Sequence, residues 1–152
     1  MGDDLVWQTT DTPVKADDGV VDAGLSAHNR AAGVLEGVRP LRCYARTASG
    51  QVVGGALAQT LGECCSLDIL WVDEALRGRG IGAELVGRVE AEAAQRGCRL
   101  VFLESFSFQA PRFYERLGYE RLCAFPGFPD GAVKYVMQKR LSEPTDGEQD
   151  DG

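Results

Sequence analysis

The sequence predicts an α+β fold: a single domain built on a mixed β-sheet over residues 1–141. The predicted elements run helix, three strands, helix, strand, helix and a final pair of strands, and the three strands are short runs joined by Gly-containing turns. A helix-linked crossover leads from the third strand to the fourth, which is typical of a sheet with a parallel pair. With 152 residues, 44% of them hydrophobic, the chain can build one sizeable core.

The first predicted elements are a helix and a three-stranded meander. Residues 17–36 place apolar side chains near helical spacing, although Gly19, Gly24 and Gly33 lower the helical propensity. Three strands are then expected at residues 41–47, 51–60 and 64–72, with turns at "ASG" and "LGE". They form an antiparallel meander that ends at Val72.

A long helix is predicted from Ile81 to its stop at Gly97. Glu84 with Arg88 and Glu92 with Arg96 form i,i+4 pairs on one face. The opposite face carries an apolar stripe: Leu85, Val86, Val89 and Ala93.

The rest of the domain reads as strand, short helix and hairpin. Residues 98–106 are apolar on both faces, which is typical of a central strand. A short helix follows, with Pro111 near its first turn, Phe113 and Leu117 facing inward and Gly118 at its end. The segments 119–125 and 132–141 then pair across the loop "PGFPDG".

The net charge of −7 is concentrated at the two ends of the chain. Residues 142–152 hold five acids and no base, and residues 1–22 hold six acids against one lysine. Between them, residues 23–141 hold 12 acids and 15 bases. We therefore expect an acidic disordered tail at 142–152 and flexibility in the first 15 or so residues, and we derive no nucleic-acid or membrane partner from the charge.

The cysteines and the apolar runs indicate the compartment. The five cysteines form no CxxC pair, and an odd count argues against both a disulfide framework and a zinc site. Free, mostly buried thiols are expected, and no metal. No run approaches the roughly 20 apolar residues of a membrane span, and the start lacks a secretory pattern. A cytoplasmic location is predicted.

The stretch "LRGRGIGAELV", residues 76–86, predicts a phosphate site. It lies between a strand and a helix, so unobstructed backbone N–H groups converge at the helix N-terminus, where the dipole adds positive charge. Arg77 and Arg79 strengthen that charge. A P-loop is excluded because no Gly-Lys-Ser/Thr is present. Gly78, Gly80 and Ala83 fit the dinucleotide-binding fingerprint, with Glu104 about 20 residues later, but five residues separate Val72 from the first glycine.

These residues also carry a family resemblance. Arg77-x-x-Gly80-x-Gly82, preceded by "LDILWVDEAL" and followed by "FQAPRFYERLGYE", resembles the GNAT superfamily of N-acetyltransferases over roughly residues 41–141. The resemblance implies a largely antiparallel mixed sheet with helices on both faces and a splayed central strand pair. It also implies acetyl-CoA as co-substrate, with its pyrophosphate on the N–H groups of residues 78–83 and its pantetheine arm along the strand before the loop. The cofactor-binding residues so implied are Leu70, Trp71, Val72, Arg77, Gly78, Arg79, Gly80, Ile81, Gly82, Ala83 and Ser107. Ser107 stands where many members carry asparagine.

Three residues are candidates for the chemistry. Tyr114 matches the family's tyrosine beside the CoA sulfur, where a phenol can protonate the departing thiolate; its alternative is a half-buried core tyrosine. Glu104, flanked by Leu103 and Phe106 near the end of the central strand, is the first candidate to take the proton of the acceptor amine, and Asp68 is the second. Either could instead be paired with an arginine or face solvent. His28 could border the acceptor pocket, or have a surface or core role.

The resemblance implies acetyl transfer to a primary amine by direct attack in a ternary complex. The alternatives are a protein or peptide N-acetyltransferase and a non-catalytic acyl-CoA-binding module. "FSF" at 106–108 and "FPGFP" at 125–129 place four phenylalanines near the expected mouth, which favours an apolar, partly closed pocket and a small-molecule acceptor. The sequence does not identify the amine, and it leaves open whether the chain forms a homodimer.

Overall fold

The computed structural model describes residues 4–141, so the predicted acidic tail at 142–152 lies outside the described residues. The chain divides into two compact units, one ending at Glu36 and the other beginning at Gly37. That residues 1–141 act as one domain stays a prediction. No helix among the described residues is both long and apolar enough to cross a membrane.

The first unit contains helix α1, Lys15–Ala32. Asp17 and Asp18 lie in its first turn, where carboxylates oppose the positive end of the helix dipole. Gly33 ends the helix in the left-handed conformation, φ 71°, and donates its N–H to the carbonyls of Asn29 and Arg30. Gly33, one of the three glycines that lower the predicted helical propensity, is therefore the C-terminal cap of the helix.

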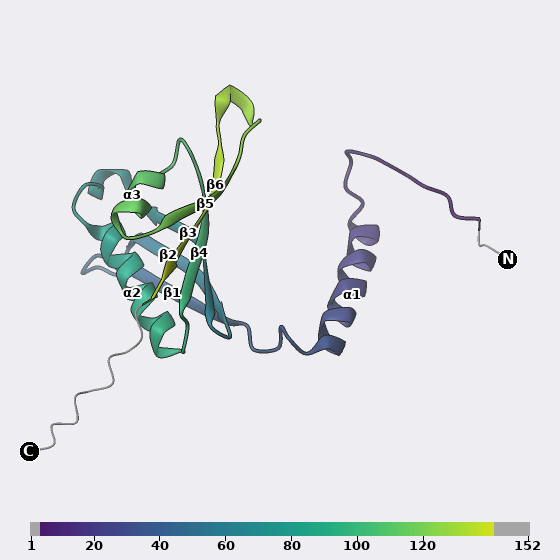
Figure 1. Ribbon diagram of the computed structural model, residues 1–152, viewed down its shortest axis with the longest axis horizontal. Helices are drawn as coiled ribbons and strands as arrows, with labels where there is room; N and C mark the ends of the chain where they lie inside the picture. The colour runs from purple at the N-terminus through teal and green to yellow at the C-terminus, as the bar shows by residue number, and fades with distance from the viewer. Residues whose placement is uncertain (1–3, 142–152) are drawn as a thin grey trace, which may run out of the picture. The chain divides into compact units, whose positions relative to one another are not determined.

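The second unit is a six-stranded sheet in the order β1-β2-β3-β4-β6-β5 (Figure 1). Strands β1, Arg39–Arg46, β2, Val52–Leu61, and β3, Cys64–Val72, form the predicted antiparallel meander. Strand β4, Leu100–Phe106, is internal as predicted, and it pairs antiparallel with β6, Lys134–Arg140. Strand β5, Glu120–Phe125, closes the edge as the first arm of the final hairpin.

The central parallel pair, β3 and β4, splays apart. Their ladder contains only three residue pairs, from Cys64 opposite Leu100 to Ser66 opposite Phe102. Beyond Ser66, the edge of β3 that faces β4 has no strand partner among the described residues, while its other edge stays paired with β2. The splay predicted from the family resemblance is confirmed, and it opens a fork in the middle of the sheet.

Helix α2, Ile81–Gln95, supplies much of the core. The predicted stripe is its buried face, and it packs on the inward side chains of the strands, such as Ala56 and Met137. Both predicted ion pairs form, at 2.8 Å between Glu84 and Arg88 and 3.0 Å between Glu92 and Arg96. The helix therefore fixes the position of its N-terminus relative to the fork.

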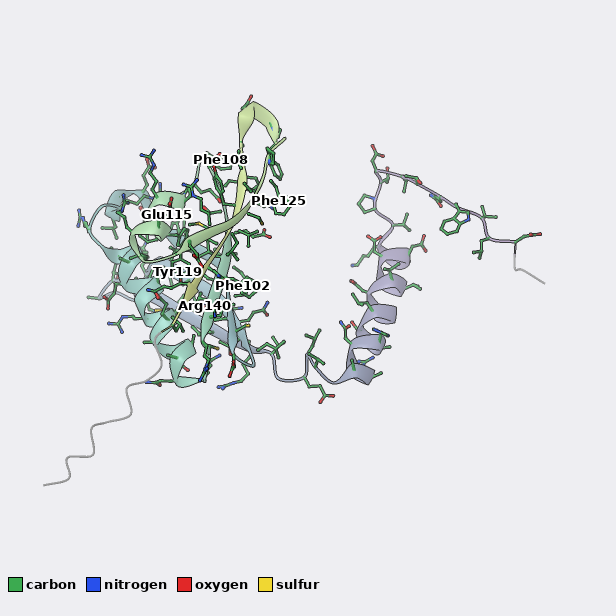
Figure 2. All side chains as sticks on the ribbon, viewed as in Figure 1. Phe102, Phe108, Glu115, Tyr119, Phe125 and Arg140 are labelled. Carbon is green, nitrogen blue, oxygen red and sulfur yellow. The ribbon has the colours of Figure 1, made fainter. Side chains whose placement is uncertain are left out.

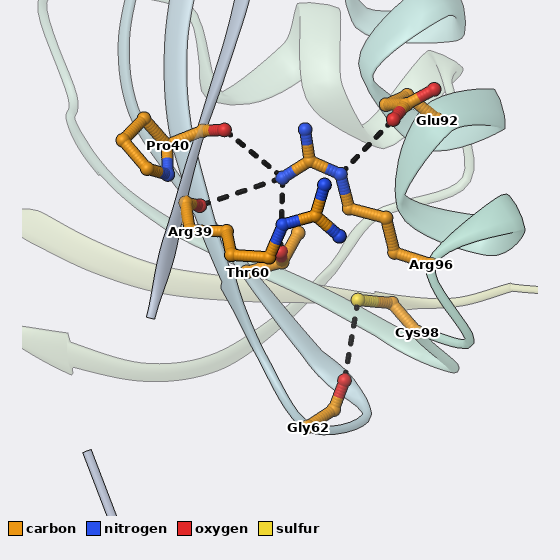
Figure 3. A network of polar contacts seen from close by, with 7 residues as sticks. All are labelled: Arg39, Pro40, Thr60, Gly62, Glu92, Arg96 and Cys98. Atoms are coloured by element: carbon orange, nitrogen blue, oxygen red, sulfur yellow. Dashed lines mark hydrogen bonds and ion pairs between the residues drawn. The ribbon is translucent and has the colours of Figure 1, made fainter. Parts of the chain in front are cut away.

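Arg96 links the C-terminal end of α2 to the first two strands (Figure 3). Its guanidinium donates to the carbonyl of Pro40 at 3.0 Å, to the hydroxyl of Thr60 at 3.1 Å and to the carboxylate of Glu92. Only 14% of the Arg96 side chain is exposed. One largely buried cation thus satisfies polar groups of two strands and orients the helix on the sheet.

The cysteines differ in part from expectation. All five are free, as predicted. Cys65 and Cys98 are buried, but Cys64 and Cys123 are exposed and Cys43 is half-buried, so the expectation of mostly buried thiols was wrong. Successive strand residues point to opposite faces of the sheet, which separates Cys64 from Cys65. Among the described residues, no group of three or more His, Cys, Asp or Glu side chains could hold a metal ion.

Candidate functional site

A cavity of about 850 Å³ occupies the fork between β3 and β4. One side is the outer half of β3 with the loop into α2, and the other is the end of β4 with helix α3, Pro111–Arg116. Asp68, Glu104 and Tyr114, which lie far apart in the sequence, all line it. The splay therefore gathers all three candidate catalytic residues around one space.

The loop before α2 adopts a backbone that only glycine takes up readily. Gly78 has φ 78° and Gly80, the residue that precedes α2, has φ 79°. A Cβ atom at Gly82 would lie 3.3 Å from Cζ of Phe113, so this glycine lets α2 and α3 approach closely. The first N–H groups of a helix have no partner within it, and here they border the cavity.

The two arginines of the loop separate. Arg77 lines the cavity, and its Nε donates to the carbonyl of Val72 at 3.0 Å, which fixes the guanidinium at the end of β3. Arg79 instead lines a second cavity, beside β1 and α2. Arg116, on α3, lines the main cavity and was missed by the sequence reasoning. No local motif marks it, because only the fold brings α3 opposite the loop.

The outer half of β3 provides the backbone edge of the site. Leu70, Trp71 and Val72 line the cavity and pair with β2 on their far side, opposite Ala56, Gly55 and Gly54. Main-chain groups on the free edge can bond an extended ligand as an added strand would.

Tyr114 lies buried at the floor of this site, with 9% of its surface exposed. Phe113 and Tyr119 contact it edge to face, with ring centroids at 5.1 and 5.7 Å. Burial raises the pKa of Tyr114 above its ordinary value, which favours the neutral phenol. A neutral phenol can donate a proton, and Tyr114 lines the cavity from which it could do so.

The two carboxylates stand on opposite arms of the fork. Glu104, on β4, is more open than its apolar neighbours suggested: 60% of its side chain is exposed, and Lys134 Nζ lies 3.4 Å from its Oε2. Glu104 is thus paired, but with a lysine rather than with an arginine. Asp68, on β3, accepts a hydrogen bond from the hydroxyl of Ser66. The site therefore presents one carboxylate on each side of the gap.

The residues expected at the mouth of the site are only partly gathered there. Phe106, Phe108 and Phe128 line a third cavity, of about 530 Å³, and Phe108 also lines the main one. Phe125 lines none of these three cavities and is 51% exposed on β5 (Figure 2). Ser107 lines the third cavity, where its hydroxyl accepts from the N–H of Val133 at 3.0 Å. His28 lies on α1, in the other unit, and its role stays a prediction.

Comparison with known proteins identifies relatives of this chain. A family model described as the acetyltransferase (GNAT) family matches residues 7–119. Blasticidin-S acetyltransferase of Streptomyces morookaense is 37% identical over 107 residues, which cover 68% of this chain and 79% of that protein. An acetyltransferase of Agrobacterium fabrum is 30% identical over 68% of this chain and 75% of its own length. The crystal structure of an acetyltransferase from Bacillus cereus superimposes with a TM-score of 0.76 at 28% identity, covering 88% of this chain and 98% of that one.

Proposed function

Since this chain belongs to the acetyltransferase (GNAT) family and is an acyltransferase, we propose that it transfers the acetyl group of acetyl-CoA to a primary amine of a small molecule. One observation carries the proposal. A single cavity joins a helix N-terminus bordered by arginine, the free edge of β3, a buried protonated tyrosine and two carboxylates. The dinucleotide alternative does not fit this fold, which is that of the acetyltransferase neighbours rather than a doubly wound parallel sheet.

In this proposal the N-terminus of α2 holds the pyrophosphate. The N–H groups from Gly78 to Ala83 donate to the phosphate oxygens, and Arg77 adds charge from the same side of the cavity. The edge of β3 at Leu70, Trp71 and Val72 binds the pantetheine arm, with an N–H near Leu70 polarising the thioester carbonyl. Arg79 and Ser107 line other cavities; Arg79 remains a proposed contact of the cofactor, and Ser107 a proposed contact of its pantetheine arm. Acetyl-CoA supplies the activated acetyl group, and no metal is invoked.

The remaining residues handle protons. The neutral amine nitrogen attacks the carbonyl carbon directly in the ternary complex, and the carbon–sulfur bond breaks. Tyr114 donates its phenolic proton to the leaving sulfur. After the attack the nitrogen carries a positive charge. Glu104 or Asp68 takes a proton from it, directly or through water, so that the nitrogen and the carboxylate both become neutral. The carboxylate of Asp68 also attracts a cationic acceptor into the fork.

The acceptor is proposed to be a small molecule. The blasticidin-S acetyltransferase relative supports this choice, and blasticidin-S is accordingly a rational first acceptor to test. A peptide acceptor and a non-catalytic acyl-CoA-binding module are the alternatives. Free cysteines suit the reducing cytoplasm, where we place the enzyme.

An amine panel tests this function. The purified chain is incubated with acetyl-CoA and blasticidin-S, other small amines or peptides, while free thiol and acetylated product are measured. We expect acceptor-dependent thiol release with at least one small amine, and a Tyr114→Phe control that is slower. Turnover with peptides alone would replace the small-molecule proposal, and CoA binding without transfer to any acceptor would favour the binding module.

A further inference from the structure

Three phenylalanine rings gather where the fork meets the β5–β6 connection. Phe106 ends β4, Phe108 follows it, and Phe128 precedes the short helix η2, Pro129–Gly131. Phe106 and Phe108 stack with centroids 5.2 Å apart and an interplanar angle of 15°, and Phe128 meets Phe106 edge to face at 4.9 Å. We call these three residues the phenylalanine cluster.

Phe108 is the open member of the cluster. One face of its ring stacks on Phe106, yet 73% of the residue is exposed. It also lines both the main cavity and the third cavity, so it lies where the two adjoin. An exposed aromatic ring at the rim of a cavity loses contact with water when a ligand covers it, which favours binding. Phe108 is not part of the hydrophobic core, so core packing does not explain its position.

The other two rings already have a cationic partner. Lys134 Nζ lies 5.0 Å from the centroid of Phe106 and 5.7 Å from that of Phe128, and it also pairs with Glu104. Among the described residues, Phe108 has no such cation over its ring. Lys134 therefore balances the charge of Glu104 beside the phenylalanine cluster. The free face of Phe108 is an uncharged aromatic surface. A flat ring suits this surface, because it can extend the stack that Phe106 and Phe108 begin.

The cavity places this surface within reach of the reaction. Phe108 shares the lining of the main cavity with Tyr114, Asp68 and Glu104. A molecule whose amine lies between the carboxylates can therefore extend its other end toward Phe108 without leaving the cavity.

We propose that Phe108 is a specificity-determining residue, on which the flat conjugated ring of the acceptor stacks. The preferred acceptors are then small amines that carry a planar ring, and purely aliphatic amines of equal size bind less well. This inference rests on the proposed function, because it assumes that the acceptor binds in the main cavity. Its test measures binding and does not require turnover.

The experiment compares two amines of equal carbon count, benzylamine, with a flat ring, and cyclohexylmethylamine, with a puckered one. Their binding to the CoA-loaded protein is measured by calorimetry, so no acetyl transfer is needed. We expect benzylamine to bind about 3- to 10-fold tighter to the unaltered protein. Phe108→Ala should abolish that preference, and Phe108→Tyr should retain it.

Phe125→Ala is the matched control, since it also removes an exposed ring but lies outside the three cavities. It should keep the preference. An equal affinity for both amines in the unaltered protein, or an unchanged preference in Phe108→Ala, would overturn the proposal. Light scattering shows whether Phe108→Ala changes the oligomeric state. Such a change without loss of the ring preference would also overturn the proposal, because Phe108 would then contact a second copy of the chain. Ring-selective binding without transfer to any amine would instead contradict the proposed function alone.

Discussion

At the scale of single residues, Tyr114 offers the most direct test of the chemistry. Tyr114→Phe keeps the edge-to-face packing with Phe113 and Tyr119 but removes the proton donor. We expect kcat to fall about 10- to 1000-fold with little change in CoA affinity, because general-acid help is worth that much when water can substitute in part. Steady-state kinetics and calorimetry measure the two quantities.

The neighbouring tyrosine supplies the control for this prediction. The Tyr119 hydroxyl is buried and has no hydrogen-bond partner among the described residues, and burial raises its pKa. Tyr119→Phe should therefore leave kcat unchanged. Equal losses in both variants would mean that loss of either hydroxyl disturbs the site to the same extent, and Tyr114 would then have no special role as proton donor.

The two carboxylates can be told apart by how each variant divides its effect between kcat and KM. If Glu104 takes the proton, Glu104→Gln should lower kcat about 10- to 100-fold, while loss of an anchor for the amine should mainly raise KM. We expect the first result for Glu104 and a smaller effect for Asp68→Asn. Glu120→Gln, at an exposed carboxylate on β5 that bonds Gln138, is the control and should change neither parameter. A large loss of kcat in Asp68→Asn but not in Glu104→Gln would mean that Asp68, rather than Glu104, takes the proton.

At the scale of elements, the junction between the loop and α2 determines whether the site binds an anion. A Cβ atom at Gly80 would meet no atom within 4 Å, so Gly80→Asp adds charge and backbone strain at φ 79° without a clash inside the protein. We expect CoA affinity to fall at least about 10-fold, since the new carboxylate repels the phosphates. Calorimetry measures it.

The control variant Gly50→Asp distinguishes repulsion of the CoA phosphates from the effect of backbone strain. Gly50 has φ 91° in the β1–β2 turn, and a Cβ atom there also meets nothing within 4 Å. The substitution should cost similar backbone strain and leave CoA affinity intact. Undiminished CoA binding in Gly80→Asp would remove the phosphate site from this loop, and tighter binding of NAD than of CoA would revive the dinucleotide alternative.

At the scale of the whole molecule, the largely buried Arg96 should matter more to stability than an exposed arginine of the same helix. Arg96→Ala strands the polar groups of Pro40, Thr60 and Glu92, and we expect the free energy of unfolding to fall by about 1–3 kcal/mol. Arg88→Ala breaks an exposed i,i+4 pair and should cost less than about 0.5 kcal/mol. Urea denaturation measures both, and equal losses would contradict a structural role for the Arg96 network.

The sequence alone predicted what short-range patterns encode. The apolar stripe and the ion pairs of α2 repeat with the period of a helix, so they specify its buried face and its exposed pairs. The glycines of residues 78–82 predicted a loop with unobstructed backbone N–H groups before a helix N-terminus, and in the structure Gly78 and Gly80 of that loop have positive φ. The family resemblance added the splay of β3 and β4, which residue spacing by itself did not reveal.

Only the tertiary structure decided which residues meet. It paired Glu104 with Lys134, placed Arg116 on the main cavity, directed Ser107 to the third cavity and left Phe125 outside all three. None of these outcomes follows from neighbours in the chain, because each depends on where β4 ends relative to β6 and on how α3 lies across the fork. Pairing register and packing set those positions through contacts between segments far apart in the sequence, whereas local patterns set only the type and the buried face of each element.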